Sequence, residues 1–380
     1  METPEPAPAR NRLRRLECLR GAAALYVFVH HYAHVVLGPH YPQIARLFKF
    51  GQFAVLLFFV VSGFVIYYAT LGAKLGPLAG ENQPKFRSYF IRRFRRIYPP
   101  FLLILPITWL VQCLIEGQLA DPRWRELAGN LAMLQDNNVA SRVAPYLENS
   151  ALWSLSYEWA FYLLFFAILR LSLRAGEDRH GAQARRRQLG WVAGLALVGV
   201  AIHRVWPNQI SLFAMYMPIW WAGAEFAREY MRTGAVSVRA QLAPLGLVTL
   251  IAGTWVVPVY ELWQSGGELS LWRHPLLELR HFLTALLILS GGLAWNAIGW
   301  RGFYPLLKPF ERVAPISYGL YIVHKPFMHL AAERSPLGDP WLELLWLIPV
   351  VGALAWVIER GIHGTVIRWL PAGHDRHDPG

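Results

Sequence analysis

Long apolar stretches separated by short polar segments run through most of the chain. A bilayer core about 30 Å thick requires roughly 20 apolar residues in a helix, and ten stretches approach this length. They lie at 18–37, 52–72, 98–115, 150–172, 189–206, 209–226, 241–261, 275–299, 314–332 and 341–359. The pattern predicts an all-α membrane protein, a polytopic bundle of about ten transmembrane helices.

The composition excludes several other classes of protein. The 380 residues are 55% hydrophobic and only 16% charged, whereas soluble chains have about 25% charged residues. The two cysteines, Cys18 and Cys113, lie in separate apolar stretches, which argues against a disulfide framework or a thiolate metal site. We therefore expect no metal and no permanently bound cofactor.

Basic residues are distributed unevenly between the polar segments. The chain has 37 Lys and Arg against 24 Asp and Glu, a formal charge of +13, and most of the excess falls in alternate segments. Cytoplasmic loops carry this excess, so both termini are predicted to be cytoplasmic and no nucleic-acid partner is needed. The predicted organisation is a cytoplasmic segment 1–17, a transmembrane domain 18–360 and a cytoplasmic polar tail 361–380.

The first apolar stretch contains an arginine and a histidine that share one helix face. Arg20 and His31 are eleven residues apart, which is three helical turns plus about 20°. His30 points about 80° away from the direction of Arg20, while His34 is a possible alternative to His31. A neutral imidazole near mid-membrane can act as a base; the alternative is a structural hydrogen bond between helices.

A carboxylate lies in the fourth apolar stretch at a depth that matches His31. Glu158 is roughly 9 Å below the outer end of its predicted helix, and Ser154 and Tyr157 precede it there as candidate substrate contacts. Two costly polar groups at one depth suggest a shared cavity, in which Glu158 would orient His31 as a carboxylate does in a hydrolase triad. The alternative is a structural bridge between helices.

His324 in the ninth stretch is also expected near mid-membrane, and we assign it to the substrate side. Its neighbour Pro326 can kink the helix and free a backbone carbonyl. A histidine that only satisfies this broken helix is the alternative to a role in the site.

Four arginines precede the third apolar stretch: Arg92, Arg93, Arg95 and Arg96. Guanidinium groups bind phosphate through two parallel hydrogen bonds, while lysine provides only a point charge. The run is therefore a candidate site for a phosphorylated co-substrate at the cytoplasmic surface. The alternative is a topological anchor.

Together these segments resemble the acyltransferase 3 family of integral membrane O-acyltransferases. The resemblance is carried in order by Leu-Arg-Gly at 19–21, Phe-Phe-Val-Val-Ser-Gly-Phe at 58–64, Arg-Phe-Arg-Arg-Ile-Tyr-Pro at 93–99, Trp-Ser-Leu-Ser-Tyr-Glu-Trp at 153–159 and Ser-Tyr-Gly-Leu-Tyr-Ile-Val-His at 317–324. It implies functional roles for Arg20, His31, Arg93, Arg96 and Glu158.

The resemblance also implies a reaction and a location. Members transfer an acyl group, often acetyl, from cytoplasmic acyl-CoA to a hydroxyl of an extracytoplasmic or lipid-linked glycan. The expected partners are acetyl-CoA or another acyl-CoA, a carbohydrate acceptor and the lipid bilayer, at the bacterial cytoplasmic (inner) membrane. A transporter or flippase of a lipid-linked sugar or acyl compound, and a non-enzymatic sensor or scaffold, remain the competing interpretations.

Overall fold

The computed structural model describes residues 7–71, 85–138, 140–174 and 177–371, and within these ranges the chain forms helices and no strand. Every one of the ten apolar stretches predicted from the sequence is largely helical. Helices satisfy all their backbone polar groups internally, which is the condition for crossing lipid.

Seven helical segments of the described chain are long and apolar enough to cross a membrane. They are Pro42–Leu71, Phe86–Glu116, Ser150–Ser172, Ala182–Val205, Val238–Gln264, Leu276–Ala297 and Leu344–Trp369. The other three predicted stretches are helices with polar or charged side chains, such as Arg20, Glu225 and Lys325, which lower their hydropathy. The prediction of about ten spans therefore exceeds what length and hydropathy alone support.

The chain divides into two compact units. The first comprises residues 1–54, 85–159 and 307–380, and the second comprises residues 55–84 and 160–306. Helices α3 (Gly51–Leu71) and α6 (Trp153–Ser172) begin in the first unit and continue in the second.

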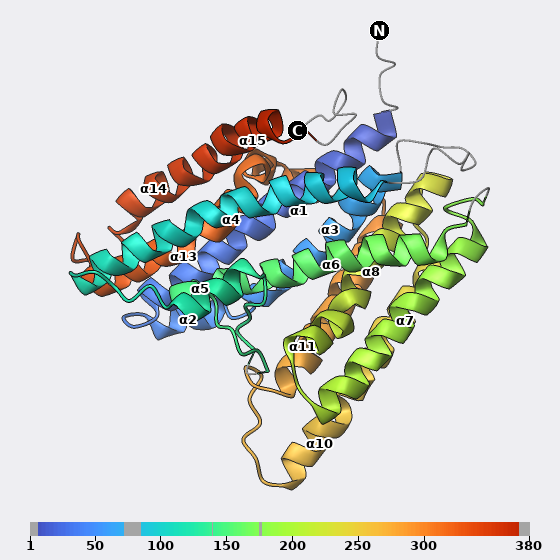
Figure 1. The fold of residues 1–380 in the computed structure, drawn as a ribbon, viewed down its shortest axis with the longest axis horizontal. Helices are drawn as coiled ribbons and strands as arrows, with labels where there is room; N and C mark the ends of the chain where they lie inside the picture. Colours follow the sequence, from blue (N-terminus) through green and yellow to red (C-terminus); the bar gives the residue numbers. More distant parts are fainter. Residues whose placement is uncertain (1–6, 72–84, 139, 175–176, 372–380) are drawn as a thin grey trace. The chain divides into compact units, whose positions relative to one another are not determined.

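The first unit is built around α13. Its elements are α1 (Ala7–Tyr32), η1 (Ala33–Leu37), α2 (Pro42–Leu47), α4 (Phe86–Glu116), α5 (Trp124–Leu131), η2 (Tyr146–Glu148), η3 (Ser150–Leu152), η4 (Lys308–Arg312), η5 (Ala314–Ile316), α13 (Ser317–Arg334), α14 (Leu344–Trp356), η6 (Val357–Ile362) and α15 (His363–Trp369). Helix α13 packs against α1, α4 and α14, so segments from both ends of the sequence meet on it (Figure 1).

A glycine allows α1 to approach the segment that leads into α13. A β-carbon on Gly21 would lie 1.9 Å from the backbone oxygen of Phe310 in η4, far inside any normal contact. Because the clash would be with backbone, no side-chain rotation could relieve it. The close approach brings the neighbouring Arg20 to the beginning of α13.

Pro326 leaves a carbonyl in α13 without its helical partner. Proline has no N–H, so the carbonyl of Ile322, four residues earlier, accepts no helical hydrogen bond from it. The buried Asn149 donates its side-chain N–H to this oxygen at 3.1 Å. The freed carbonyl, which the sequence predicts, thus binds the segment around η2 and η3 to the middle of α13.

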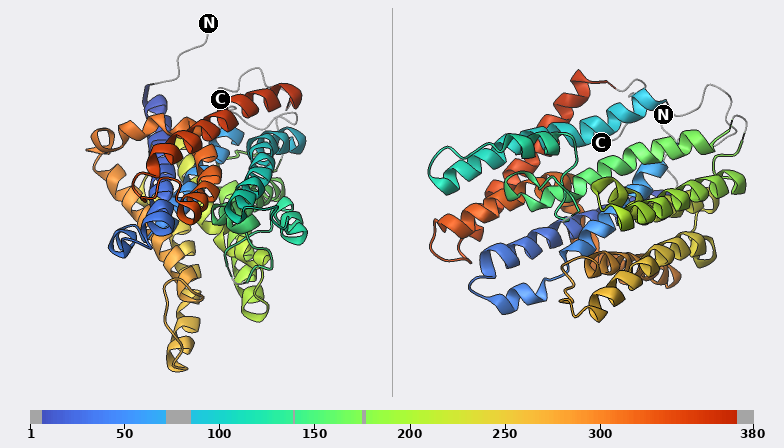
Figure 2. Two further views of the ribbon diagram at one scale, coloured as in Figure 1. Left: turned by 90° about the vertical axis from the view of Figure 1, so that its left-hand side faces the viewer. Right: turned by 60° about the horizontal axis from the view of Figure 1, so that its bottom comes forward.

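The second unit contains α7 (Ala182–Val205), α8 (Gln209–Thr233), α9 (Val238–Thr254), α10 (Val256–Gln264), α11 (Leu276–Ala297) and α12 (Phe303–Leu307). Helix α8 is almost entirely buried and packs against α7 and α9, while α9 also packs against α11 (Figure 2). Glu225 on α8 is paired with Arg185 at 2.6 Å and with Arg228 at 3.2 Å, so this buried carboxylate is compensated.

Candidate active site

Two histidines from opposite ends of the sequence meet in the first unit. His31 near the end of α1 lies with its Nδ1 2.7 Å from Nε2 of His324 on α13. The rings are nearly parallel, with an interplanar angle of 17° and centroids 5.0 Å apart. The contact joins α1 to α13 directly, and it involves the imidazole that the sequence indicates as a base.

The hydrogen bonds of this pair fix which nitrogens carry hydrogen. Nδ1 of His324 lies 2.9 Å from the carbonyl oxygen of Leu320, and a carbonyl can only accept, so this nitrogen carries the hydrogen. In neutral His324 the other nitrogen, Nε2, then has the lone pair and accepts from Nδ1–H of His31. Neutral His31 consequently has its own lone pair on Nε2, which is the form required of a base.

The other two histidines of the first stretch face elsewhere. His30 Nδ1 contacts the carbonyl oxygen of Phe48, and His34 Nε2 lies 3.3 Å from the same oxygen. The alternative that the sequence left open, a base at His34, therefore has no support in the geometry, since it is His31 that faces α13.

Arg20 lies at the beginning of α13. Its Nη2 donates to Ser317 Oγ at 3.1 Å and to the carbonyl oxygen of Ala314 at 3.4 Å. Seven residues separate Ser317 from His324, which corresponds to about 10 Å along the helix. Arg20 and His31 thus reach two levels of the same helix, as expected from their shared face.

A carboxylate that sequence analysis missed binds one of the four arginines. Glu359 in the π-helical segment η6 pairs with Arg96, and its other oxygen accepts the backbone N–H of Gly319 at 3.2 Å. Arg96 also lies over the ring of Tyr318, with 5.3 Å to the centroid. A lone carboxylate at the end of the apolar stretch 341–359 was the available signal, because such a group is rarely buried without a partner.

A second close approach places this carboxylate. A β-carbon on Gly319 would lie 2.7 Å from the carbonyl oxygen of Ala355 in α14. Only glycine lets α13 and α14 touch here, and the contact brings Glu359, one turn beyond Ala355, to the Gly319 N–H.

The remaining arginines of the cluster differ in their surroundings. Arg95 is 3% exposed and donates to the carbonyl oxygen of Leu370 at 3.3 Å. Arg93 lies over the ring of Tyr89, with 5.8 Å to the centroid, and Arg92 is half-buried. Arg95 therefore contacts the C-terminal part of the first unit, whereas Arg93 lies over the buried ring of Tyr89 on its own helix.

Glu158 does not provide the partner of His31 that the sequence suggested. The hydrogen bond of His31 goes to His324, and Glu158 lies near the charge of Arg20 and near Tyr318 and Tyr321. Matching depth could not reveal this, because it does not specify which helix faces α1.

The two predicted substrate contacts of α6 point in different directions. Ser154 Oγ is 2.8 Å from the hydroxyl of Tyr321 on α13, while Tyr157 donates its hydroxyl to Asp136 Oδ2 at 2.6 Å. Ser154 is therefore part of the packing around α13. Tyr157 is buried against the segment that follows α5.

Lys325, next to the histidine pair, is a buried cation. Its side chain is 8% exposed, and within the described ranges it forms no hydrogen bond or ion pair with another side chain. Its charge acts on the rings of both His31 and His324. Glu148 is a carboxylate whose charge acts on Lys325. A largely buried cation is costly unless negative charge compensates it, which makes Lys325 a candidate for binding negative charge that develops during a reaction.

Comparison with known proteins decides the family. Residues 13–360 match the family described as "Acyltransferase domain". The chain belongs to this acyltransferase family. It is also similar to "Acyltransferase MdmB" of Streptomyces mycarofaciens, with 31% identity over 166 residues that cover 40% of this chain. The match spans 38% of that relative's length, and no solved structure matches the chain.

The family and the apolar helices together make this acyltransferase a multi-pass membrane protein. In the part of the acyltransferase that the structure describes, no three His, Cys, Asp or Glu side chains are grouped so that they could hold a metal ion. The His31–His324 pair, Lys325 and the arginines are the groups of the candidate site that could take part in chemistry.

Proposed function

We propose that this protein is an O-acyltransferase that moves an acyl group, often acetyl, from cytoplasmic acyl-CoA to a hydroxyl of an extracytoplasmic or lipid-linked glycan. The observation that carries the proposal is the contact between His31 and His324, because it leaves His31 with a lone pair on Nε2. The cellular location that goes with this reaction is the bacterial cytoplasmic membrane.

The topology is part of the same proposal. Ten spans with both termini in the cytoplasm put the arginines of the α4 N-terminal turns on the cytoplasmic side, in agreement with the excess of basic residues there. Helices α1, α8 and α13 are then spans whose polar side chains face the interior of the protein, where such residues are tolerated.

The base in the proposed reaction is His31. Its Nε2 removes the proton of the acceptor hydroxyl while the hydroxyl oxygen attacks the carbonyl carbon of the thioester. The tetrahedral intermediate expels the CoA thiolate, which takes the proton from His31 and leaves as CoA thiol. His324 orients His31 through its Nε2 and thus has the position that Glu158 was expected to occupy. An acyl-histidine intermediate is a variant of the same route.

Lys325 is our candidate for stabilising the intermediate. The carbonyl oxygen becomes an oxyanion when the acceptor attacks, and preorganised donors in a site that excludes water stabilise such charge strongly. Lys325 is a largely buried residue next to His324, and its charge acts on the rings of both histidines, so its ammonium would favour negative charge that develops beside the pair.

Arg93 and Arg96 are proposed to hold the phosphates of acyl-CoA. Both lie in the first turns of α4, and guanidinium groups suit phosphate. Arg96 is already paired with Glu359, so a phosphate would share or displace this carboxylate. Arg20, with Glu158 nearby, would hold the pantetheine arm close to the beginning of α13.

The proposed function is tested by release of free thiol from acetyl-CoA. Purified wild-type protein in nanodiscs is compared with His31→Ala at matched expression and thermal stability. We expect the wild type to release thiol and the variant to be slower by a factor of about 100 or more, which is the usual contribution of a positioned base.

Two results would contradict the proposal. Equal thiol release by the wild type and His31→Ala would remove His31 from the chemistry. An absence of thiol release with acetyl-, succinyl- and longer acyl-CoA, together with no binding of these donors, would instead favour a transporter and leave the arginines as topological anchors.

A further inference from the structure

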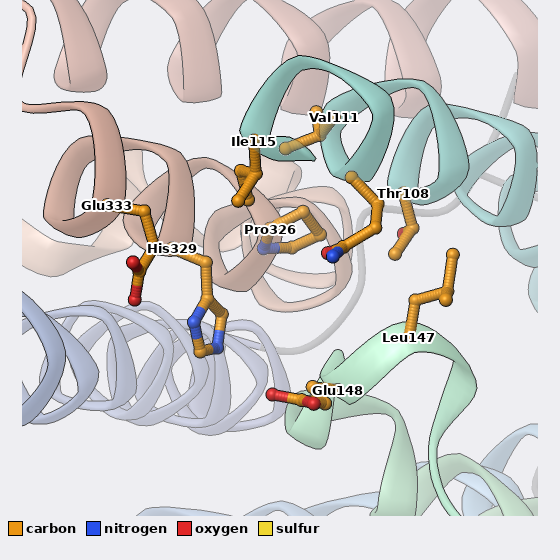
Figure 3. Close-up of a pocket in the computed structure, with 9 residues that line it drawn as sticks. Thr108, Val111, Ile115, Leu147, Glu148, Pro326, His329 and Glu333 are labelled. Carbon is orange, nitrogen blue, oxygen red and sulfur yellow. The ribbon is translucent and has the colours of Figure 1, made fainter. Parts of the chain in front are cut away.

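A small polar cavity lies between α4, α13 and η2 of the first unit. Its volume is about 150 Å³. It is lined by Thr108, Val111, Gln112, Ile115, Leu147, Glu148, Pro326, His329 and Glu333 (Figure 3). A cavity of roughly this size can hold one six-membered ring, so it suits a single sugar ring or headgroup and not an entire acceptor.

Hydrogen bonds outside the cavity leave its lining rich in acceptors. Thr108 uses its only hydroxyl hydrogen on the carbonyl oxygen of Ile104 at 2.8 Å, and Gln112 donates from its amide nitrogen to Glu116 at 2.8 Å. The Thr108 oxygen and the Gln112 carbonyl oxygen are therefore left to accept, and one amide N–H of Gln112 remains to donate. The carboxylates of Glu148 and Glu333 are acceptor-only groups when ionised.

One imidazole in the lining has an unused nitrogen. Nε2 of His329 is buried and has no hydrogen-bond partner among the described residues. Figure 3 shows His329 between Glu333, on its own helix, and Glu148, on η2. A buried polar atom without a partner costs free energy, and a ligand in the cavity would supply the missing hydrogen bond.

The backbone around Glu148 is held in an uncommon conformation. Leu147 and Glu148 have φ of 44° and 62°, a left-handed region that costs residues other than glycine about 1–3 kcal/mol each. Glu126 Oε1 accepts the N–H of Leu147 at 2.6 Å, and Asn149 is bound to α13. These contacts together hold Glu148 at the cavity.

The cavity and the arginines lie at opposite ends of α4. From Arg96 to Thr108 the helix rises by about 18 Å, and from His324 to His329 α13 rises by about 8 Å. On the proposed topology, acyl-CoA would enter at the arginine end and a ligand in the cavity would enter from the outer side. The His31–His324 pair lies between these two entrances along α13.

We propose that this cavity is a subsite for a donor-rich, non-anionic part of the acceptor, with an amine-bearing sugar ring preferred to a neutral one and an anionic one excluded. The inference rests on the proposed transferase function. Its basis is the acceptor-rich lining, which contains two carboxylates and no Lys or Arg. Lys325, next to the lining Pro326, is a cation whose charge acts on His329 and Glu148, and the two carboxylates outnumber it. An ammonium group would bind Glu148 and Glu333 through charge-assisted hydrogen bonds, whereas a carboxylate or phosphate would be repelled.

The test is ligand-observed saturation-transfer NMR on the full-length protein in nanodiscs. The probes are methyl α-D-glucosaminide, methyl α-D-glucopyranoside and methyl α-D-glucuronide, which are cationic, neutral and anionic. We expect the wild type to bind them in that order of decreasing affinity. Glu148→Gln and Glu333→Gln should each weaken binding of the glucosaminide about tenfold, with a smaller effect on the glucopyranoside.

A matched control is Glu261→Gln, which removes one exposed carboxylate of α10 that does not line the cavity; it should leave the binding order unchanged. Because Glu148 and Glu333 are both exposed, their glutamine variants should fold, and thermal unfolding verifies this. Equal binding of the three probes, no signal from the glucosaminide, or glutamine variants that bind like the wild type would each overturn the proposal. If the wild type shows the expected order but releases no thiol from acetyl-CoA, the transferase function fails and the binding site stands.

Discussion

Two neutral imidazoles in contact share one hydrogen between them, and this makes His324 a testable partner of His31. Replacing His324 by Ala should lower kcat roughly tenfold to a hundredfold, a part of the 10²–10⁴ that a positioned base contributes, because His31 loses the acceptor that orients it. The KM for acetyl-CoA should change little. Steady-state thiol release measures both constants.

A merely structural role of His324 would give another result. His324→Gln keeps a side-chain carbonyl that can accept from His31 Nδ1–H, so it should recover part of the kcat lost in the alanine variant. Equal loss in both variants, with lowered thermal stability in each, would show that His324 only packs.

A substitution of Lys325 should affect activity and stability in different directions. Lys325→Met keeps the length of the side chain and removes a charge that is 8% exposed. Because removing a charge from water is unfavourable and no hydrogen bond or ion pair of Lys325 is found among the described residues, the variant should be at least as stable as the wild type by thermal unfolding. If the ammonium stabilises the oxyanion, kcat should fall roughly a hundredfold, with partial recovery in Lys325→Arg. An unchanged kcat would remove Lys325 from the mechanism.

Pairs of residues on the same helix could be predicted from the sequence, whereas contacts between residues on different helices could not. Arg20 and His31 lie on one face because helix geometry alone fixes their directions. The partner of His31 depends on which side of α13 packs against α1, and hydropathy contains no such information, so Glu158 was chosen in place of His324. The position of Glu359 could not be predicted for the same reason, because it depends on the contact between α13 and α14.

At the level of helices, α1 and η4 approach each other closely at Gly21. Gly21→Ala would force a β-carbon to within 1.9 Å of the Phe310 oxygen, and overpacking of this kind usually costs about 1–3 kcal/mol or more. We expect a lower Tm and a reduced kcat, because Arg20 and His31 would both shift on α13.

The control for this change is Gly246→Ala in α9. A β-carbon there meets nothing within 4 Å, and alanine is better than glycine inside a helix by about 0.5–1 kcal/mol. The Tm should therefore stay the same or rise. A Gly21→Ala protein with the Tm of the wild type would mean that α1 and η4 can separate without loss.

Helix positions were predictable because each apolar stretch encodes its own length, and all ten stretches are helical. The two π-helical segments could not be predicted in this way. The π-helical η1 and η6 follow His31 and contain Glu359, respectively, and π-helical turns occur often at functional sites. They arise from packing and not from periodicity, so a pattern of 3.6 residues per turn cannot show them.

For the stability of the molecule as a whole, a histidine in the segment before α7 predicts a dependence on pH. Burial, together with the positive charge of Arg228, lowers the pKa of His180 to about 4; its Nδ1 lies 3.2 Å from the hydroxyl of Tyr67. In the unfolded chain the pKa is about 6.5. Between these values the unfolded state binds more protons, so stability falls as the pH drops from about 6.5 to about 4.

Thermal unfolding of the wild type from pH 7 to pH 4, beside His180→Gln, measures this contribution. Glutamine cannot be protonated in this range, so the variant should lose less Tm on acidification. If both proteins show the same slope, other groups cause the acid lability and His180 stays neutral without consequence for folding.

His31 and His324 are 293 positions apart, so the proposed catalytic pair can form only late in the synthesis of the chain. At roughly 5–20 residues per second, a ribosome needs about 15–60 s to make the second histidine after the first. During that time Arg93 and Arg96 already exist, but His31 has no His324 to orient it. On the proposed mechanism an unfinished chain could therefore bind acyl-CoA without hydrolysing the thioester, and a protease cut that removes α13 would abolish activity.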